Sequence, residues 1–245
     1  DLLLKNTYMD KVFGPVERAS AASRWSKKYK GRAELVTSYA NLPDSSMWSP
    51  LIWAAEQISP ECVELLLQDR ADVGWVDDNN LTCLHFAVAN IKQYKEPNEV
   101  DDIMKVVRYI VPKMSTEALQ QVGRTGRGPK CSALYLAVLN IVEDKEEVLD
   151  VNINSRVYKV VQAMLDALPA PSSGGNVEIN REGILKQCNQ DNPRTPLILA
   201  VDQLTTGKVQ LEAVSLIPHF QLIHLLATEG CINEGKQGKG DKGLM

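Results

Sequence analysis

Apolar and polar positions follow a helical period along this chain, and one arrangement of them recurs. A hydroxyl residue is followed by a small residue or proline, Leu, a bulky residue, an apolar residue and Ala. This order occurs at residues 49–55, 82–88, 132–138 and 195–201. Ser or Thr can cap a helix by accepting a backbone N–H, and proline is tolerated at the first helical position. The pattern therefore predicts that a helix begins at each of these four places.

A second apolar segment with helical spacing follows each of these predicted helices. The second segments are residues 62–73, 103–111, 157–165 and 220–233. In the first of them, Val63, Leu66 and Leu67 share one helical face, which we expect to be buried. In the last, Gly230 is the residue at which we expect the helix to end. The sequence thus predicts helix–turn–helix units.

The first two units stand 33 residues apart, from Ser49 to Thr82, with a polar turn at residues 77–80 between them. A helix–turn–helix unit of this length resembles the ankyrin repeat. The resemblance implies an all-α fold, an ankyrin-repeat solenoid of stacked helix pairs joined by finger-like turns. It also implies a module that binds another protein. Gly, Asn and Asp are common in such turns because they tolerate a positive φ.

The later units are longer than the repeat that they resemble. Ser132 follows Thr82 by 50 residues, and Thr195 follows Ser132 by 63 residues. We therefore expect insertions at residues 91–101, 141–155, 169–183 and 203–217. Long surface loops add little closure entropy, and each unit of a solenoid needs only its neighbours. Such a stack tolerates insertions of this kind.

The same pattern divides the chain into parts. Residues 1–43 are predicted to be an N-terminal helical cap or a degenerate repeat, because apolar residues recur at helical spacing over residues 18–42 and predict a helix there. Residues 44–234 hold the four ankyrin-like repeats with their insertions. Residues 235–245 are a Gly/Lys-rich tail or the start of a further repeat, so we expect the chain to be a fragment of a longer protein.

Composition narrows the classes of partner and the cellular setting. The net charge of −4 provides no cationic field for nonspecific nucleic-acid binding, so no nucleic-acid partner is expected. The five cysteines are scattered without a CxxC pair, which favours neither disulfides nor zinc and indicates an intracellular, cytoplasmic location. No apolar run approaches the roughly 20 residues that span a bilayer, so no integral membrane segment is expected.

Candidate catalytic and ligand-binding motifs were weighed and set aside. His219 and His224 are five residues apart, which is not the spacing of a helical zinc pair. His85 stands where the ankyrin motif itself carries a His that holds the turn between units. Residues 123–130 resemble a phosphate-binding loop, but Pro129 interrupts it, and we expect a finger there instead. We expect no catalytic residue, no metal, no cofactor and no small-molecule substrate, and hence not an enzyme.

The resemblance places one apolar residue of each motif on the concave face of the solenoid. These residues are Trp53, Phe86, Leu136 and Leu199. We expect them to form an apolar stripe for a partner, unless they pack along the inner helices and are half-buried. One turn further lie the carboxamides Gln57, Asn90, Asn140 and Gln203. They would bond a bound peptide, unless they are merely solvated.

The turn between the first two units adds three candidate partner-binding residues, Trp75, Asp78 and Asn79. An aromatic side chain beside a carboxylate suits a basic partner, although Trp75 could equally pack between fingers. The predicted function is a non-catalytic protein–protein interaction scaffold that binds through its concave face, fingers and insertions, as a subunit of a large assembly. The alternative is the regulatory ankyrin region of a larger enzyme or membrane channel.

Overall fold

The computed structural model describes the part of the chain that holds the recurring motifs. The described residues are 39–89, 91, 96–126, 128–140, 151–168, 181–186, 194–206 and 217–231. The predicted helix at residues 18–42 therefore lies outside them, apart from a short 3-10 helix, η2 (Tyr39–Asn41). The tail at 235–245 and most of the expected insertions also lie outside the described residues.

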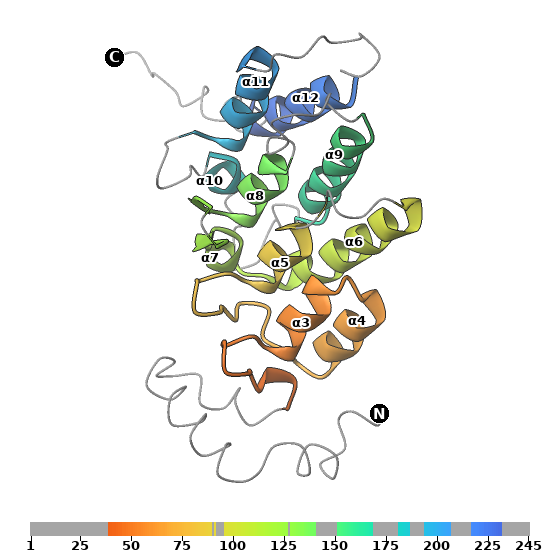
Figure 1. Cartoon of the computed structure of the whole chain (residues 1–245), viewed down its shortest axis with the longest axis vertical. Helices are drawn as coiled ribbons and strands as arrows, with labels where there is room; N and C mark the ends of the chain where they lie inside the picture. The colour runs from red at the N-terminus through yellow and green to blue at the C-terminus, as the bar shows by residue number, and fades with distance from the viewer. Residues whose placement is uncertain are drawn as a thin grey trace, which may run out of the picture.

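Two layers of helices stack along the long axis of the molecule (Figure 1). The first-helix layer contains α3 (Pro50–Glu56), α5 (Cys83–Ala89), α8 (Ala133–Leu139) and α11 (Pro196–Thr206). The second-helix layer contains α4 (Pro60–Gln68), α6 (Pro97–Ile110), α9 (Val151–Asp166) and α12 (Ile217–Cys231). Each helix contacts the next helix of its own layer and its partner in the other layer. The expected all-α class and the expected helix pairs are confirmed.

The hydroxyl residues before the first helices act largely as predicted. The side-chain oxygens of Ser49, Ser132 and Thr195 each accept the backbone N–H three residues further on, at 3.2–3.3 Å. Each satisfies a donor that the start of a helix would otherwise leave unpaired. Thr82 differs, because its hydroxyl oxygen lies 2.9 Å from the Nδ1 atom of His85. The motif therefore starts four helices, three of them with the expected cap.

Two second helices are longer than the sequence predicted. Helix α6 begins at Pro97 and α9 at Val151, so part of each expected insertion is helical. The start of α6 has a capping box in which Glu99 accepts the backbone N–H of Glu96 at 2.9 Å, and Pro97 occupies the first turn. Helix α12 continues through Gly230 to Cys231, so the predicted end at Gly230 is wrong. The terminal turns of helices fray, so a helix end often lies one or two residues from the position that a local signal predicts.

Three short elements that the sequence analysis did not predict lie beside the main pairs. They are η4 (Val111–Lys113), α7 (Thr116–Leu119) and α10 (Arg181–Lys186). Ser115 caps α7 by accepting the backbone N–H of Ala118 at 3.2 Å. Among the described residues, no helix is long and apolar enough to cross a membrane.

Three finger loops precede the first helices of the units. Finger 1 is residues 44–48, finger 2 is residues 77–81, and finger 3 is residues 123–131, which holds strands β1 (Gly123–Arg124) and β2 (Lys130–Cys131). The two strands pair antiparallel, which confirms the predicted finger in this segment. The three fingers lie along one edge of the first-helix layer, and fingers 2 and 3 are joined because Arg124 donates its backbone N–H to the Asn79 carbonyl at 3.1 Å.

Candidate functional site

Three aromatic side chains from three elements meet at the N-terminal end of the stack. Trp48 lies in finger 1, Trp53 in α3 and Phe86 in α5. The ring centroids of Trp48 and Trp53 are 4.7 Å apart, and those of Trp48 and Phe86 are 4.5 Å apart with the rings nearly edge to face. Trp53 remains 46% exposed, and the other two are partly buried. We call these three residues the aromatic cluster; it joins two consecutive units.

A carboxylate fixes the position of two members of this cluster. Asp44 Oδ2 accepts the indole N–H of Trp53 at 3.1 Å. Asp44 Oδ1 accepts the backbone N–H groups of Ser46 and Trp48 at 2.8 and 3.0 Å. Asp44 therefore shapes finger 1 and orients Trp53 at the same time. Its side chain is only partly buried, so the carboxylate borders the exposed aromatic surface.

Finger 2 repeats this turn exactly one family period later in sequence. Asp44 donates its backbone N–H to Trp48 and Asp77 donates its own to Leu81, each at 3.0 Å. Met47 and Asn80 occupy the same turn position, with φ of 63° and 62°. Asp77 is buried, however, whereas Asp44 is not. The same backbone turn is thus internal in finger 2 and open to the surface in finger 1.

The predicted apolar stripe is present only in its first half. Trp53 and Phe86 belong to the aromatic cluster, as expected for a surface that a partner could reach. Leu136 and Leu199 are only 6% and 5% exposed, so they belong to the core. The prediction of a continuous exposed stripe is wrong for these two residues, because the helix position that faces outward in α3 is covered in α8 and α11.

The predicted row of carboxamides is not a row of equivalent surface groups. Asn140 is buried, and its Nδ2 group donates to the carbonyl oxygens of Val88 at 2.8 Å and Leu136 at 3.0 Å. It ties α8 to α5, so its assignment to partner binding is wrong. Gln57 is exposed and donates to the Glu56 carboxylate. Asn90 lies outside the described residues, and the side chain of Gln203 is likewise not described.

The turn residues of finger 2 separate into a buried and an exposed group. Trp75 is 1% exposed, and its indole N–H donates to the Met47 carbonyl at 2.8 Å. It therefore packs between fingers 1 and 2, and its assignment to partner binding is wrong. Asp78 and Asn79 are exposed at the tip of finger 2 and stay candidates. Asp77 holds that tip by accepting the backbone N–H groups of Asn79 and Leu81 at 2.8 Å each.

A comparison with protein-family models matches the Ankyrin repeat over residues 47–78. The matched segment runs from finger 1 through α3 and α4 to the tip of finger 2. The chain contains an ankyrin repeat. Ankyrin repeats are generally protein–protein interaction modules. The matched ankyrin unit is the one that supplies Trp48 and Trp53.

His85 has the structural role in this ankyrin protein that the resemblance implied. Its Nδ1 atom accepts the backbone N–H of Thr82 at 3.1 Å, and its Nε2 atom lies 3.2 Å from the Cys131 carbonyl oxygen. Nε2 is therefore the protonated nitrogen that donates to Cys131. Burial lowers the pKa of His85 to about 4, and burial raises the pKa values of the Cys83 and Cys131 thiols to about 12. At neutral pH these groups carry no charge.

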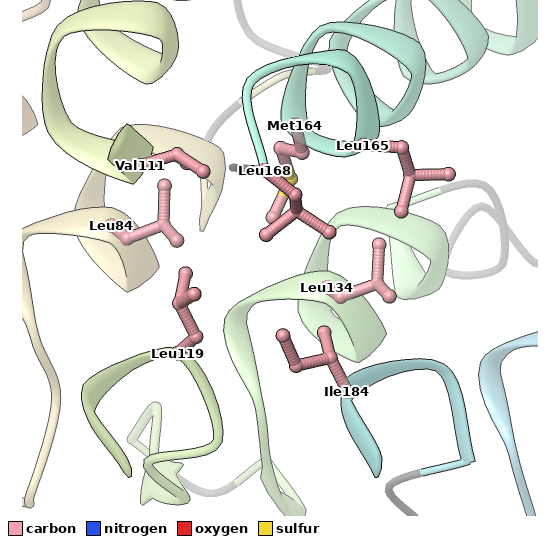
Figure 2. A pocket seen from close by; sticks show the side chains of 8 residues that line it. All are labelled: Leu84, Val111, Leu119, Leu134, Met164, Leu165, Leu168 and Ile184. Carbon is pink, nitrogen blue, oxygen red and sulfur yellow. The ribbon is translucent and has the colours of Figure 1, made fainter. Parts of the chain in front are cut away.

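A small apolar cavity lies between the helix layers in the middle of the ankyrin stack (Figure 2). Its lining comes from α5, η4, α7, α8, α9 and α10, and the side chains point toward one another in Figure 2. The lining residues are Leu84, Val111, Leu119, Leu134, Met164, Leu165, Leu168 and Ile184. Its volume of about 10 Å³ is close to the least that holds one water molecule. It is a packing gap rather than a ligand site.

Sequence reasoning missed Asp44 and Trp48, which complete the exposed site. The signal was present in the chain, because Asp44 and Trp48 precede Asp77 and Leu81 by 33 residues, the same spacing as Ser49 and Thr82. The recurring motif defined above begins at Ser49 and so leaves out the preceding turn. Extending the ankyrin register backward by one turn predicts a finger at residues 44–48.

Proposed function

We propose that this ankyrin-repeat protein is a non-catalytic scaffold that binds a partner protein through the aromatic cluster and the exposed tip of finger 2. The observation that carries the proposal is the 46% exposure of Trp53 within a cluster that three elements hold in place. Fully burying a large apolar side chain contributes about 1.5–3 kcal/mol, so covering the exposed 46% of Trp53 would contribute roughly half of that. Trp is also among the residues that dominate binding energy at interfaces.

The stack of four helix pairs supports this function because it presents the cluster on a fixed framework. Bonds between units restrict the relative motion of fingers and helices. Trp75 bonds Met47, His85 bonds Cys131, and Asn140 bonds Val88. A surface that is organised before binding loses little conformational entropy when the partner arrives.

An intracellular setting is part of the same proposal. Cys62, Cys83 and Cys131 are free thiols, and Cys62 is exposed. Free thiols are typical of proteins in a reducing compartment. We also propose that the chain is a subunit of a larger assembly. The partner would bind the first-helix layer, which holds the aromatic cluster, and the second-helix layer would remain available for contacts with other subunits.

The experiment is a quantitative pull-down with the tagged full chain and single variants. Trp53→Ala removes the exposed member of the cluster, and Leu65→Ala is the matched control because Leu65 is 53% exposed on α4, in the other layer. We expect a partner that wild type and Leu65→Ala recover equally and that Trp53→Ala loses. Equal recovery by all three proteins, with unchanged melting temperatures, would contradict the proposal.

A further inference from the structure

We propose that the partner presents an arginine side chain, whose guanidinium group lies on the exposed surface of Trp53 and pairs with the Asp44 carboxylate. This inference rests on the proposed function and names the chemistry that the aromatic cluster recognises. Three observations support it: the hydrogen bonding of Asp44, the packing of the aromatic rings, and the shape of a cation that Trp53 and Asp44 can bind together.

Among the described residues, the contacts of Asp44 leave one acceptor position of its carboxylate open. An ionised carboxylate offers about four acceptor positions on its two oxygens. Oδ1 accepts two backbone N–H groups, whereas the one donor to Oδ2 from the described part of the chain is the indole N–H of Trp53. In the part of the chain that the structure describes, no Lys or Arg side chain forms an ion pair with Asp44. The open position on Oδ2 lies beside Trp53 and can accept a donor from a partner.

Trp53 supplies the second half of the site. Its N–H group is already bonded to Asp44, so the ring edge is anchored while 46% of the side chain stays exposed. The face of an indole attracts cations through its quadrupole, by about 0.5–2 kcal/mol depending on desolvation. Trp48 packs against the Trp53 ring, and Phe86 packs in turn against Trp48, so the position of Trp53 is supported by both units.

The geometry distinguishes arginine from other cations. The centroids of Trp48 and Trp53 are 4.7 Å apart, so the rings touch and leave no gap between them for a rounded quaternary ammonium group. A guanidinium group is flat, so it can stack on one indole face and donate N–H groups from its edge to a carboxylate. A lysine ammonium makes only one of these contacts well. The net charge of −4 further favours approach by a basic partner.

The experiment selects peptides from a random library on the immobilised full chain and measures the affinity of the selected peptides by titration. We expect arginine to be enriched at one position. Replacing that arginine with citrulline, which has the same shape and no charge, should weaken binding to wild type roughly tenfold. On Asp44→Asn the same replacement should cost clearly less, about threefold, because pairing with the carboxylate is lost and only the attraction of the cation to the Trp53 face remains.

The controls separate this inference from the proposed function. Asp44→Asn keeps a side-chain oxygen for finger 1, and its melting temperature reports whether the turn survives. If Asp44→Asn does not fold, the affinities of the citrulline peptide and of a peptide with lysine at the same position, both measured on wild type, still decide the question. Each should bind more weakly than the arginine peptide. Two results would overturn this inference alone. One is that the selected peptides need Trp53 but show no preference for arginine. The other is that citrulline weakens binding equally on wild type and Asp44→Asn. If no selected peptide loses affinity on Trp53→Ala, both this inference and the proposed function are overturned.

Discussion

The Nε2–H group of His85 in α5 donates a hydrogen bond to the carbonyl oxygen of Cys131 at the end of finger 3, 3.2 Å away. The other ring nitrogen accepts the backbone N–H of Thr82 at 3.1 Å. One neutral imidazole thus joins the start of its own helix to the next unit. A proton added to Nδ1 would remove the acceptor and place a charge in the core.

Acid should therefore destabilise the chain through His85. Its pKa is about 4 in the folded state and 6.5 ordinarily, so between these pH values the unfolded state binds the proton. The free energy of unfolding should fall by up to about 3 kcal/mol from this group as pH drops through that window. Urea unfolding at several pH values measures it. His85→Gln should show a shallower dependence, whereas exposed His224→Gln should match wild type; identical slopes in all three would refute the prediction.

Gly123→Ala should weaken the contact between fingers 2 and 3. A Cβ atom at residue 123 would lie 2.6 Å from the Asn80 carbonyl oxygen and 2.6 Å from a methyl group of Leu81. Overpacking of this kind costs about 1–3 kcal/mol. Chemical denaturation measures the change. Gly126→Ala is the control, since nothing lies within 4 Å and only its φ of +53° opposes a side chain, at about 1 kcal/mol.

Asn140→Ala should destabilise the chain by about 1–3 kcal/mol, because the buried Val88 carbonyl loses its donor from α8. Gln57→Ala should change the free energy of unfolding by less than about 0.5 kcal/mol, because Gln57 is exposed at the end of α3. Thermal unfolding of the two variants gives the comparison. Equal effects would mean that the two carboxamides have the same environment, contrary to the structure.

Alkylation should distinguish Cys62 from Cys83 and Cys131. Cys62 is exposed, whereas burial raises the pKa values of Cys83 and Cys131 to about 12, so almost no thiolate forms at these two near neutral pH. In the native chain, iodoacetamide should label Cys62 before Cys83 and Cys131, which should react only as urea unfolds the chain. Mass spectrometry of the labelled peptides reads this out. Native labelling of Cys83 as fast as that of Cys62 would show that α5 opens readily.

The sequence predicted those features that depend on local order. The cap at Ser49, the proline at the start of α3 and the 33-residue step to Thr82 are set by neighbouring residues, and each is seen in the structure. Finger 3 was also predicted, from its position before Ser132. These signals are short in range, so a single chain is enough to read them.

Features set by distant segments were not predictable in the same way. Trp53 and Leu136 have the same place in the motif, yet one is exposed and the other buried. The difference depends on which segments pack over each helix, and no local period encodes it. For the same reason the sequence leaves open whether Trp75 binds a partner or packs between fingers, because the Met47 carbonyl that it bonds lies 28 residues earlier. The start of α6 at Pro97 does have a local signal, the capping box of Glu96 and Glu99, which the apolar period alone does not reveal.

The hydrogen bonds between fingers have a mechanical consequence. Trp75 bonds back to Met47, and Arg124 bonds back to Asn79, so the fingers form a bonded line beside the packed helices. Helix packing is nondirectional and yields gradually as apolar surfaces slide, whereas a hydrogen bond fails abruptly once its partners separate. Under tension along the stack, the hydrogen bonds between fingers would resist small extensions and would break first. The packed helices would then extend gradually at lower force.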